Sequence, residues 1–300
     1  MITLAEFMVN MMGIKTIIKN RIKSHLGVTI PDNTNFIDYA DYIKLPPTYI
    51  PDPLWPSLDD IADGQIGMIV RDRDDLGVAA RCAFTITATA NYLVDWGDGT
   101  SNTIVSGTMA DHTYALGAGT PDSKGTTTFK VRISSTGTIT RVLMASKLAT
   151  GNVKQTVQSV EIKAGGITTL DSAFAFCGML QRMGDINLAS CSGANSTFLY
   201  CPALISIGNI AMQNCLSVVS MFNACLSLRS IGNFDLPKCT AATSVLYFCG
   251  ELVSVGSVNL PLCTSVATLF YACVSLQTIG DMSRIGSGAA SVDCDSMFFR

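Results

Sequence analysis

Apolar and small residues recur at a fixed period of 24 residues through the second half of the chain, residues 157–300. One column of the repeat holds cysteines: Cys177, Cys201, Cys225, Cys249 and Cys273. A second column holds glycines: Gly184, Gly208, Gly232, Gly256 and Gly280. Cysteines also recur from Cys191 to Cys263, and a leucine column runs from Leu180 to Leu276. A fixed period in the twenties is typical of a solenoid, in which stacked coils bury a shared core.

The repeat unit reads S-x-F-x-x-C-x-x-L-x-x-I-G-x-φ-x-L-x-x-C, where φ is apolar. We expect "L-x-x-I-G-x-φ" to give one short strand per coil, with neighbouring coils about 4.8 Å apart in a parallel sheet. "S-x-F-x-x-C" predicts a helical or irregular turn on the opposite side. Each cysteine is interpreted as a small, reduced side chain that fills a recurring core slot. Each glycine marks a turn where a Cβ would clash.

Residues 64–146 alternate β-branched runs with turn clusters, which predicts a β-rich domain. Between two such runs lies "VDWGDGTSNTIVSGTMADHTY". The glycines at 97 and 99 permit a tight turn with positive φ, and the carboxylate of Asp98 can bond the turn backbone. Trp96 is expected to fill the core between two sheets.

This WGDGT…HxY pattern resembles the signature of polycystic-kidney-disease-like (PKD) domains. The matching residues are Trp96, Gly97, Asp98, Gly99, His112 and Tyr114. The resemblance implies an immunoglobulin-like β-sandwich with a spacer role. The longer "ALGAGTPDSKG" loop after the tyrosine departs from the family pattern.

The first 45 residues predict two short amphipathic helices, over 3–25 and 35–44. Thr3 and Glu6 form a capping box at the start of the first helix. Two such helices bury too little surface to be stable alone, so we expect an anchor that oligomerises or binds another protein. A simple helical hairpin on the next domain is the alternative. Residues 46–63 are rich in proline and predict a semi-rigid linker.

The repeat resembles the BspA-like leucine-rich repeats, in particular the variant that reads "M-F-x-x-C-x-x-L". The sequence as a whole thus predicts a multidomain α+β protein: helical anchor over 1–45, linker over 46–63, PKD-like sandwich over 64–146 and leucine-rich-repeat solenoid over 147–300.

Composition and charge narrow the function classes. The formal net charge of −3 argues against a nucleic-acid groove, and no apolar run is long enough to span a membrane. Eleven cysteines without an export signal or a CxxC motif favour reduced thiols.

Candidate chemistry is sparse. His25 and His112 are the only histidines, and no nucleophile motif accompanies them. "RDRDDLG" fails as a calcium loop because Leu76 occupies a ligand position. Asn195 begins a glycosylation sequon that we interpret as an accident of the repeat. No catalytic, cofactor-binding or metal-ligating residue is predicted.

The order of parts resembles bacteriophage virion proteins such as tail or head fibres. That resemblance implies a non-enzymatic structural and binding protein, assembled in the host cytoplasm into the virion. It would form a homo-oligomer, with a trimer favoured, bind other virion proteins through its N-terminal helices and contact a host surface glycan or protein. A secreted bacterial surface adhesin is the alternative, and a polysaccharide-degrading enzyme is the second alternative.

The last printed residues lie in the middle of a repeat unit. Met297 and Phe298 match the apolar columns at Met221 and Phe222. Because a final coil exposes a core-sized apolar face, we expect Met297, Phe298 and Phe299 to be buried in an assembly contact or against further chain.

Overall fold

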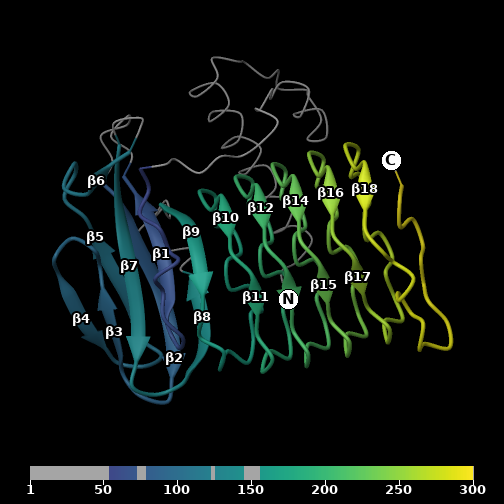
Figure 1. The fold of residues 1–300 in the computed structure, drawn as a ribbon, viewed down its shortest axis with the longest axis horizontal. Coiled ribbons are helices and arrows are strands. Elements are labelled where there is room, and N and C mark those ends of the chain that lie inside the picture. The colour runs from purple at the N-terminus through teal and green to yellow at the C-terminus, as the bar shows by residue number, and fades with distance from the viewer. Residues whose placement is uncertain (1–53, 73–78, 123–125, 145–155, 300) are drawn as a thin grey trace, which may run out of the picture. The chain divides into compact units, whose positions relative to one another are not determined.

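The computed structural model describes residues 54–72, 79–122, 126–144 and 156–299, all within one compact unit, Ile50–Arg300. Every regular element in this part of the chain is a β-strand (Figure 1). The long strands are β1 (Ile66–Arg71), β2 (Arg81–Ala88), β3 (Tyr92–Asp95), β4 (Ser101–Ile104), β5 (Met109–Thr113), β7 (Thr127–Ser135), β8 (Ile139–Met144) and β9 (Val157–Ile162). The two-residue strands are β6 (Thr120–Pro121), β10 (Arg182–Met183), β11 (Ile186–Asn187), β12 (Ser206–Ile207), β13 (Ile210–Ala211), β14 (Ser230–Ile231), β15 (Phe234–Asp235), β16 (Ser254–Val255), β17 (Val258–Asn259) and β18 (Thr278–Ile279).

The prediction of a mixed α+β fold is therefore wrong, because the described ranges contain strands, turns and no helix. The helices expected over 3–25 and 35–44 lie outside the described residues. Within the coils, the physical reason is that alternate amides of the "S-x-F-x-x-C" segment bond to the next coil, while the amides between them make only turn bonds to the third residue before. A helix needs bonds from each amide to the fourth residue before it.

The first part of the described chain folds into two sheets. β2 pairs with β5 and with β8 in a three-stranded sheet. β1, β7, β3 and β4 form the edge of a second sheet, in the order β1-β7-β3-β4. β1 is mainly apolar and buried, whereas β7 alternates buried Phe129, Val131 and Ile133 with polar residues. Trp96, Phe84 and Phe129 are each almost fully buried in the core of this part.

The described end of the predicted linker packs on these sheets. Ile61 is buried against Gly67, where a Cβ would meet the Ile61 side chain within 2.5 Å. Asp60 forms ion pairs with both Lys130 and Arg132. Residues 54–63 are thus held against β1 and β7, whereas residues 46–53 lie outside the described part.

Strand β9 joins the first part to the coils. On one side it pairs antiparallel with β1, from Ile66 opposite Ile162 to Val70 opposite Val157. On the other side it pairs in parallel with β10, with Val160 opposite Met183. The outcome is one sheet of eleven strands in the order β18-β16-β14-β12-β10-β9-β1-β7-β3-β4, with β6 on β7 (Figure 1).

The three-stranded sheet also continues into the coils. Arg141 in β8 forms a parallel bridge with Thr169, and the ladder runs on through Gly193, Ser217, Ala241, Ser265 and Asp293. The amide of Thr168 donates to the Thr140 carbonyl, and the amide of Met144 donates to the Ala173 carbonyl. The two sheets of the first part therefore cover the first coil, and the buried residues of both parts form one continuous cluster.

Each coil of the solenoid has three hydrogen-bonded sides. The first is the parallel ladder from β10 to β18, and the second is the four-stranded sheet β11-β13-β15-β17. The third begins at the bridge ladder and continues through the "S-x-F-x-x-C" segment. There the amides of Val218, Ser220, Phe222 and Ala224 donate to carbonyls of the next coil over 2.8–3.0 Å. This regular pairing between coils is why the segment is not helical.

The third side bends because two residues in each coil have left-handed backbone conformation. In the third coil these are Ser220 (φ 56°) and Ala224 (φ 59°), and the same two columns repeat in neighbouring coils. Left-handed conformation costs a non-glycine residue about 1–2 kcal/mol. Both amides donate to the next coil, to the carbonyls of Thr243 and Tyr247. We infer that these repeated bonds offset the strain.

The glycine column lies where one coil touches the backbone of the preceding coil. A Cβ on Gly232 would lie 2.8 Å from the Asn209 amide nitrogen and 2.8 Å from the Gly208 carbonyl carbon. These are backbone atoms, so no side-chain movement could relieve the clash. The column is thus needed for close approach of coils, not for positive φ.

We predict that Gly232→Ala lowers the free energy of unfolding by about 1–3 kcal/mol through this overpacking. Gly250→Ala is the matched control, because nothing lies within 4 Å of its Cβ position and its φ is not positive. It should be neutral or slightly stabilising. Urea unfolding of both variants would measure the difference, and equal stabilities would contradict the packing argument.

Candidate binding surfaces

The turn after β3 holds the first residues of the WGDGT…HxY pattern, and the histidine packs against it. Gly97 and Gly99 have φ of 78° and 86°, and the Asp98 carboxylate accepts a hydrogen bond from the Thr100 amide over 3.0 Å. The same carboxylate lies 2.7 Å from His112 Nε2. Burial raises the pKa of Asp98, but the bonds from Thr100 and His112 outweigh that effect and leave the pKa below its usual value.

Trp96 lies beneath this turn as part of an aromatic cluster. Its indole Nε1 donates to Asn102 Oδ1 over 2.8 Å, and its ring stacks on His112 with centroids 4.6 Å apart. Tyr114 meets the His112 ring edge-on and donates its hydroxyl to the Trp96 carbonyl over 3.1 Å. With Trp96 only 1% exposed, this group braces the turn and offers no face to a ligand.

The first cysteine column forms a ladder of thiol hydrogen bonds inside the solenoid. Each thiol donates to a carbonyl 27 residues earlier: Cys201 to Phe174 at 3.0 Å, Cys225 to Phe198 at 3.1 Å, Cys249 to Phe222 at 3.2 Å and Cys273 to Leu246 at 3.0 Å. All eleven cysteines of the chain are free, and only Cys294 is exposed. The slot thus takes a small apolar side chain that also satisfies a buried carbonyl.

Burial raises the pKa of the column thiols, to about 12 for Cys177 and Cys273 and well above the usual value for Cys225. Because the thiolate is the reactive form, these thiols should be inert in the folded protein. In the second column a hydrogen bond with Cys239 lowers the pKa of Cys263, but that thiol is fully buried and out of reach of a reagent. We predict that iodoacetamide at pH 8 adds a single group to the native protein, at Cys294, and eleven groups after denaturation. Intact-mass spectrometry counts the adducts, and rapid native labelling of Cys225 would contradict the buried ladder.

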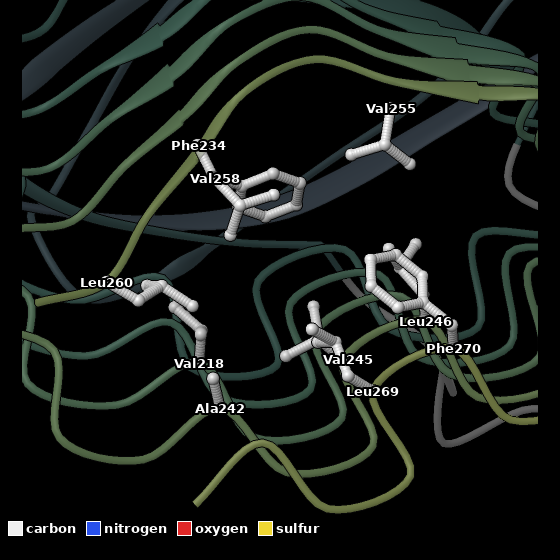
Figure 2. A pocket seen from close by; sticks show the side chains of 10 residues that line it. All are labelled: Val218, Phe234, Ala242, Val245, Leu246, Val255, Val258, Leu260, Leu269 and Phe270. Carbon is white, nitrogen blue, oxygen red and sulfur yellow. The ribbon is translucent and has the colours of Figure 1, made fainter. Parts of the chain in front are cut away.

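A small internal cavity of about 10 Å³ lies where the phenylalanine column is interrupted. Phe174, Phe198 and Phe222 stack with centroids 5.4 and 5.1 Å apart, but the next coil carries Leu246 in this column. Figure 2 shows Leu246 beside Phe270, with Phe234 and Val258 across the gap. All ten lining residues are apolar, and a site with no polar partner does not hold water. This cavity is a packing defect and not a ligand site.

We predict that Leu246→Phe is tolerated, because the new ring would extend into this cavity. Leu252→Phe in the same coil is the matched control: Leu252 is fully buried and does not line the cavity. The control should lose about 1–3 kcal/mol through overpacking. Thermal unfolding would rank the two, and a larger loss for Leu246→Phe would show that the gap cannot accept the ring.

A polar groove of about 390 Å³ crosses the C-terminal ends of β9, β10 and β12, where the first part of the chain meets the first coils. Its lining comprises Glu161, Lys163, Arg182, Met183, Gly184, Asp185, Ser206, Ile207 and Gly208. Gly208 packs closely on Asp185 in the groove lining, because a Cβ at position 208 would meet the Asp185 side chain and backbone within 3.0 Å. This volume falls within the range of small-ligand sites, about 300–1,000 Å³.

The charged groups of the groove are partly paired. Lys163 Nζ lies 2.9 Å from Glu161 Oε1, and this pair, aided by the charges of Asp185 and Asp63, raises the pKa of Lys163. Asp185 Oδ1 accepts the Asn209 amide over 2.7 Å. Asp185 Oδ2, the Ser206 hydroxyl and the Arg182 guanidinium have no hydrogen-bonding partner within the described ranges.

Sequence reasoning missed this groove, although a signal was present. At the column of Arg182 the next three coils carry serine: Ser206, Ser230 and Ser254. At the column of Asp185 the next two coils carry Asn209 and Asn233. The first coil thus departs from its own repeat at two charged positions on one surface.

In the isolated chain, the last coil leaves two aromatic rings exposed. Phe298 and Phe299 are 52% and 55% exposed, and they stack on Phe270 and Tyr271 with centroids 5.2 and 5.1 Å away. Met297 packs partly against the core. Of the three residues expected to be buried in a contact, only Met297 is covered by this chain's own residues, and burial of the phenylalanines by a partner stays a prediction.

The remaining candidate residues carry no site. Asn195 Oδ1 accepts bonds from Ser217 and from the Val219 amide, and Thr197 of the sequon is fully buried. His25 and Leu76 lie outside the described residues. Histidine, cysteine and acidic side chains in the described ranges do not cluster as a metal site would require.

The described ranges contain no helix with the length and apolar character needed to span a membrane.

Comparisons of this chain with family models, with curated proteins and with solved structures found no match.

Proposed function

We propose that this chain is a non-enzymatic structural and binding protein of a bacteriophage virion, a tail or head fibre-like appendage that presents its solenoid to a host cell or to another virion protein. The observation that best supports the proposal is β9, which ties the sandwich and the solenoid into one hydrogen-bonded sheet. A spacer that shares a sheet with its binding module holds the module in a fixed orientation. A fixed orientation suits an appendage that presents its binding module to another surface.

Residues 1–45 attach the chain to other virion proteins, and the protein forms a homo-oligomer, with a trimer favoured. The ladders of the solenoid face outward as rigid rows at intervals of about 4.8 Å. A rigid surface loses little conformational entropy on binding, which favours its use in recognition.

Immunogold electron microscopy with antibodies to residues 54–300 tests this function in a culture that produces the protein. We expect gold on phage particles released by lysis. Gold on the bacterial envelope before lysis would instead favour the adhesin, and depolymerisation of capsular polysaccharide by the purified chain, seen as released reducing sugar, would favour the enzyme.

A further inference from the structure

We infer that the groove across β9, β10 and β12 is a binding site for a neutral, hydroxyl-rich ligand, namely an uncharged glycan. This inference rests on the proposed presenting role and gives that role a place and a ligand class. The concave surface is larger, at about 390 Å³, than the pocket of about 210 Å³ beside Phe298 and the cavity of about 10 Å³ beside Leu246.

The unpaired groups of the groove favour hydroxyls as partners. Asp185 Oδ2 can only accept a hydrogen bond, the Arg182 guanidinium can only donate, and the Ser206 hydroxyl can do both. A sugar hydroxyl is donor and acceptor at once, so adjacent hydroxyls of one ring can donate to Asp185 and accept from Arg182. An apolar ligand would leave all three groups desolvated and unpaired, at a cost in binding.

The balance of charge argues against an ionic ligand. Glu161 and Asp185 oppose Lys163 and Arg182 along the lining, which gives no net charge. A carboxylate or sulfate drawn to Arg182 would lie in the same groove as Asp185 and Glu161. An ammonium drawn to Asp185 would likewise meet Arg182 and Lys163.

The position of these groups is specific to this end of the solenoid. Later coils carry serine or threonine in the column of Arg182, and asparagine or serine in the column of Asp185 until Asp281. The same backbone therefore folds with neutral residues at both columns. The charges in the first coil are not required for stacking, and both side chains are exposed where a ligand can reach them.

The repeat itself supplies conservative test variants. Asp185→Asn retains the oxygen that accepts the Asn209 amide, as Asn209 Oδ1 does for the Asn233 amide at 3.0 Å. Arg182→Ser installs the residue of the next coil. Asn233→Asp is the control, because it places a carboxylate in the same column but outside the groove lining.

The purified chain would be applied to an array of neutral, uronic-acid, sulfated and amino-sugar oligosaccharides, and the strongest neutral binder titrated by calorimetry. We expect a Kd below about 1 mM, weakened at least tenfold by Asp185→Asn and by Arg182→Ser and unchanged by Asn233→Asp. Thermal unfolding should be the same for all four proteins.

Three results would overturn the inference: no neutral oligosaccharide bound, binding confined to charged sugars, or neutral binding that both groove variants retain. Particle labelling by immunogold does not depend on any of these results. A protein found on particles that fails this assay would leave the proposed function standing and remove only the assigned site.

Discussion

The double pairing of β9 is the interaction on which the described structure depends. A solenoid coil has an apolar interior that must be covered at each end of the stack. Here the antiparallel bonds of β9 to β1 and its parallel bonds to β10 place the sheets of the first part over the first coil. The bridge between Arg141 and Thr169 does the same on the other sheet. The first coil therefore stacks on preformed strands and not on solvent.

A strict period is the second constraint, and it follows from the stacking. Once coils pair in register, each position must be compatible with the residue 24 places before it and 24 after it. Close approach excludes a Cβ at Gly232, and the thiol of Cys225 must reach the carbonyl of Phe198. A single departure, such as Leu246 among the phenylalanines, leaves a measurable gap.

Residues that break the repeat on the surface of the solenoid do not disturb its packing, unlike those that break it in the core. Outward residues do not fill the interior, so stacking does not dictate their identity. Arg182 and Asp185 break the repeat on the surface, beside the strand that joins the two parts. The proposed ligand site lies at this junction.

The sequence by itself determined the period, the buried columns and the turn at Gly97 and Gly99, because each depends on contacts that recur or lie close along the chain. It did not determine the third side of the coil, where an expected helical or irregular turn bonds from Ser220 to Thr243. Nor did it reveal that β9 pairs with β1, since Ile66 and Ile162 are joined by no local pattern. The groove was likewise decided only by tertiary structure: Lys163 and Arg182 share its lining because parallel strands bring residues from successive coils together.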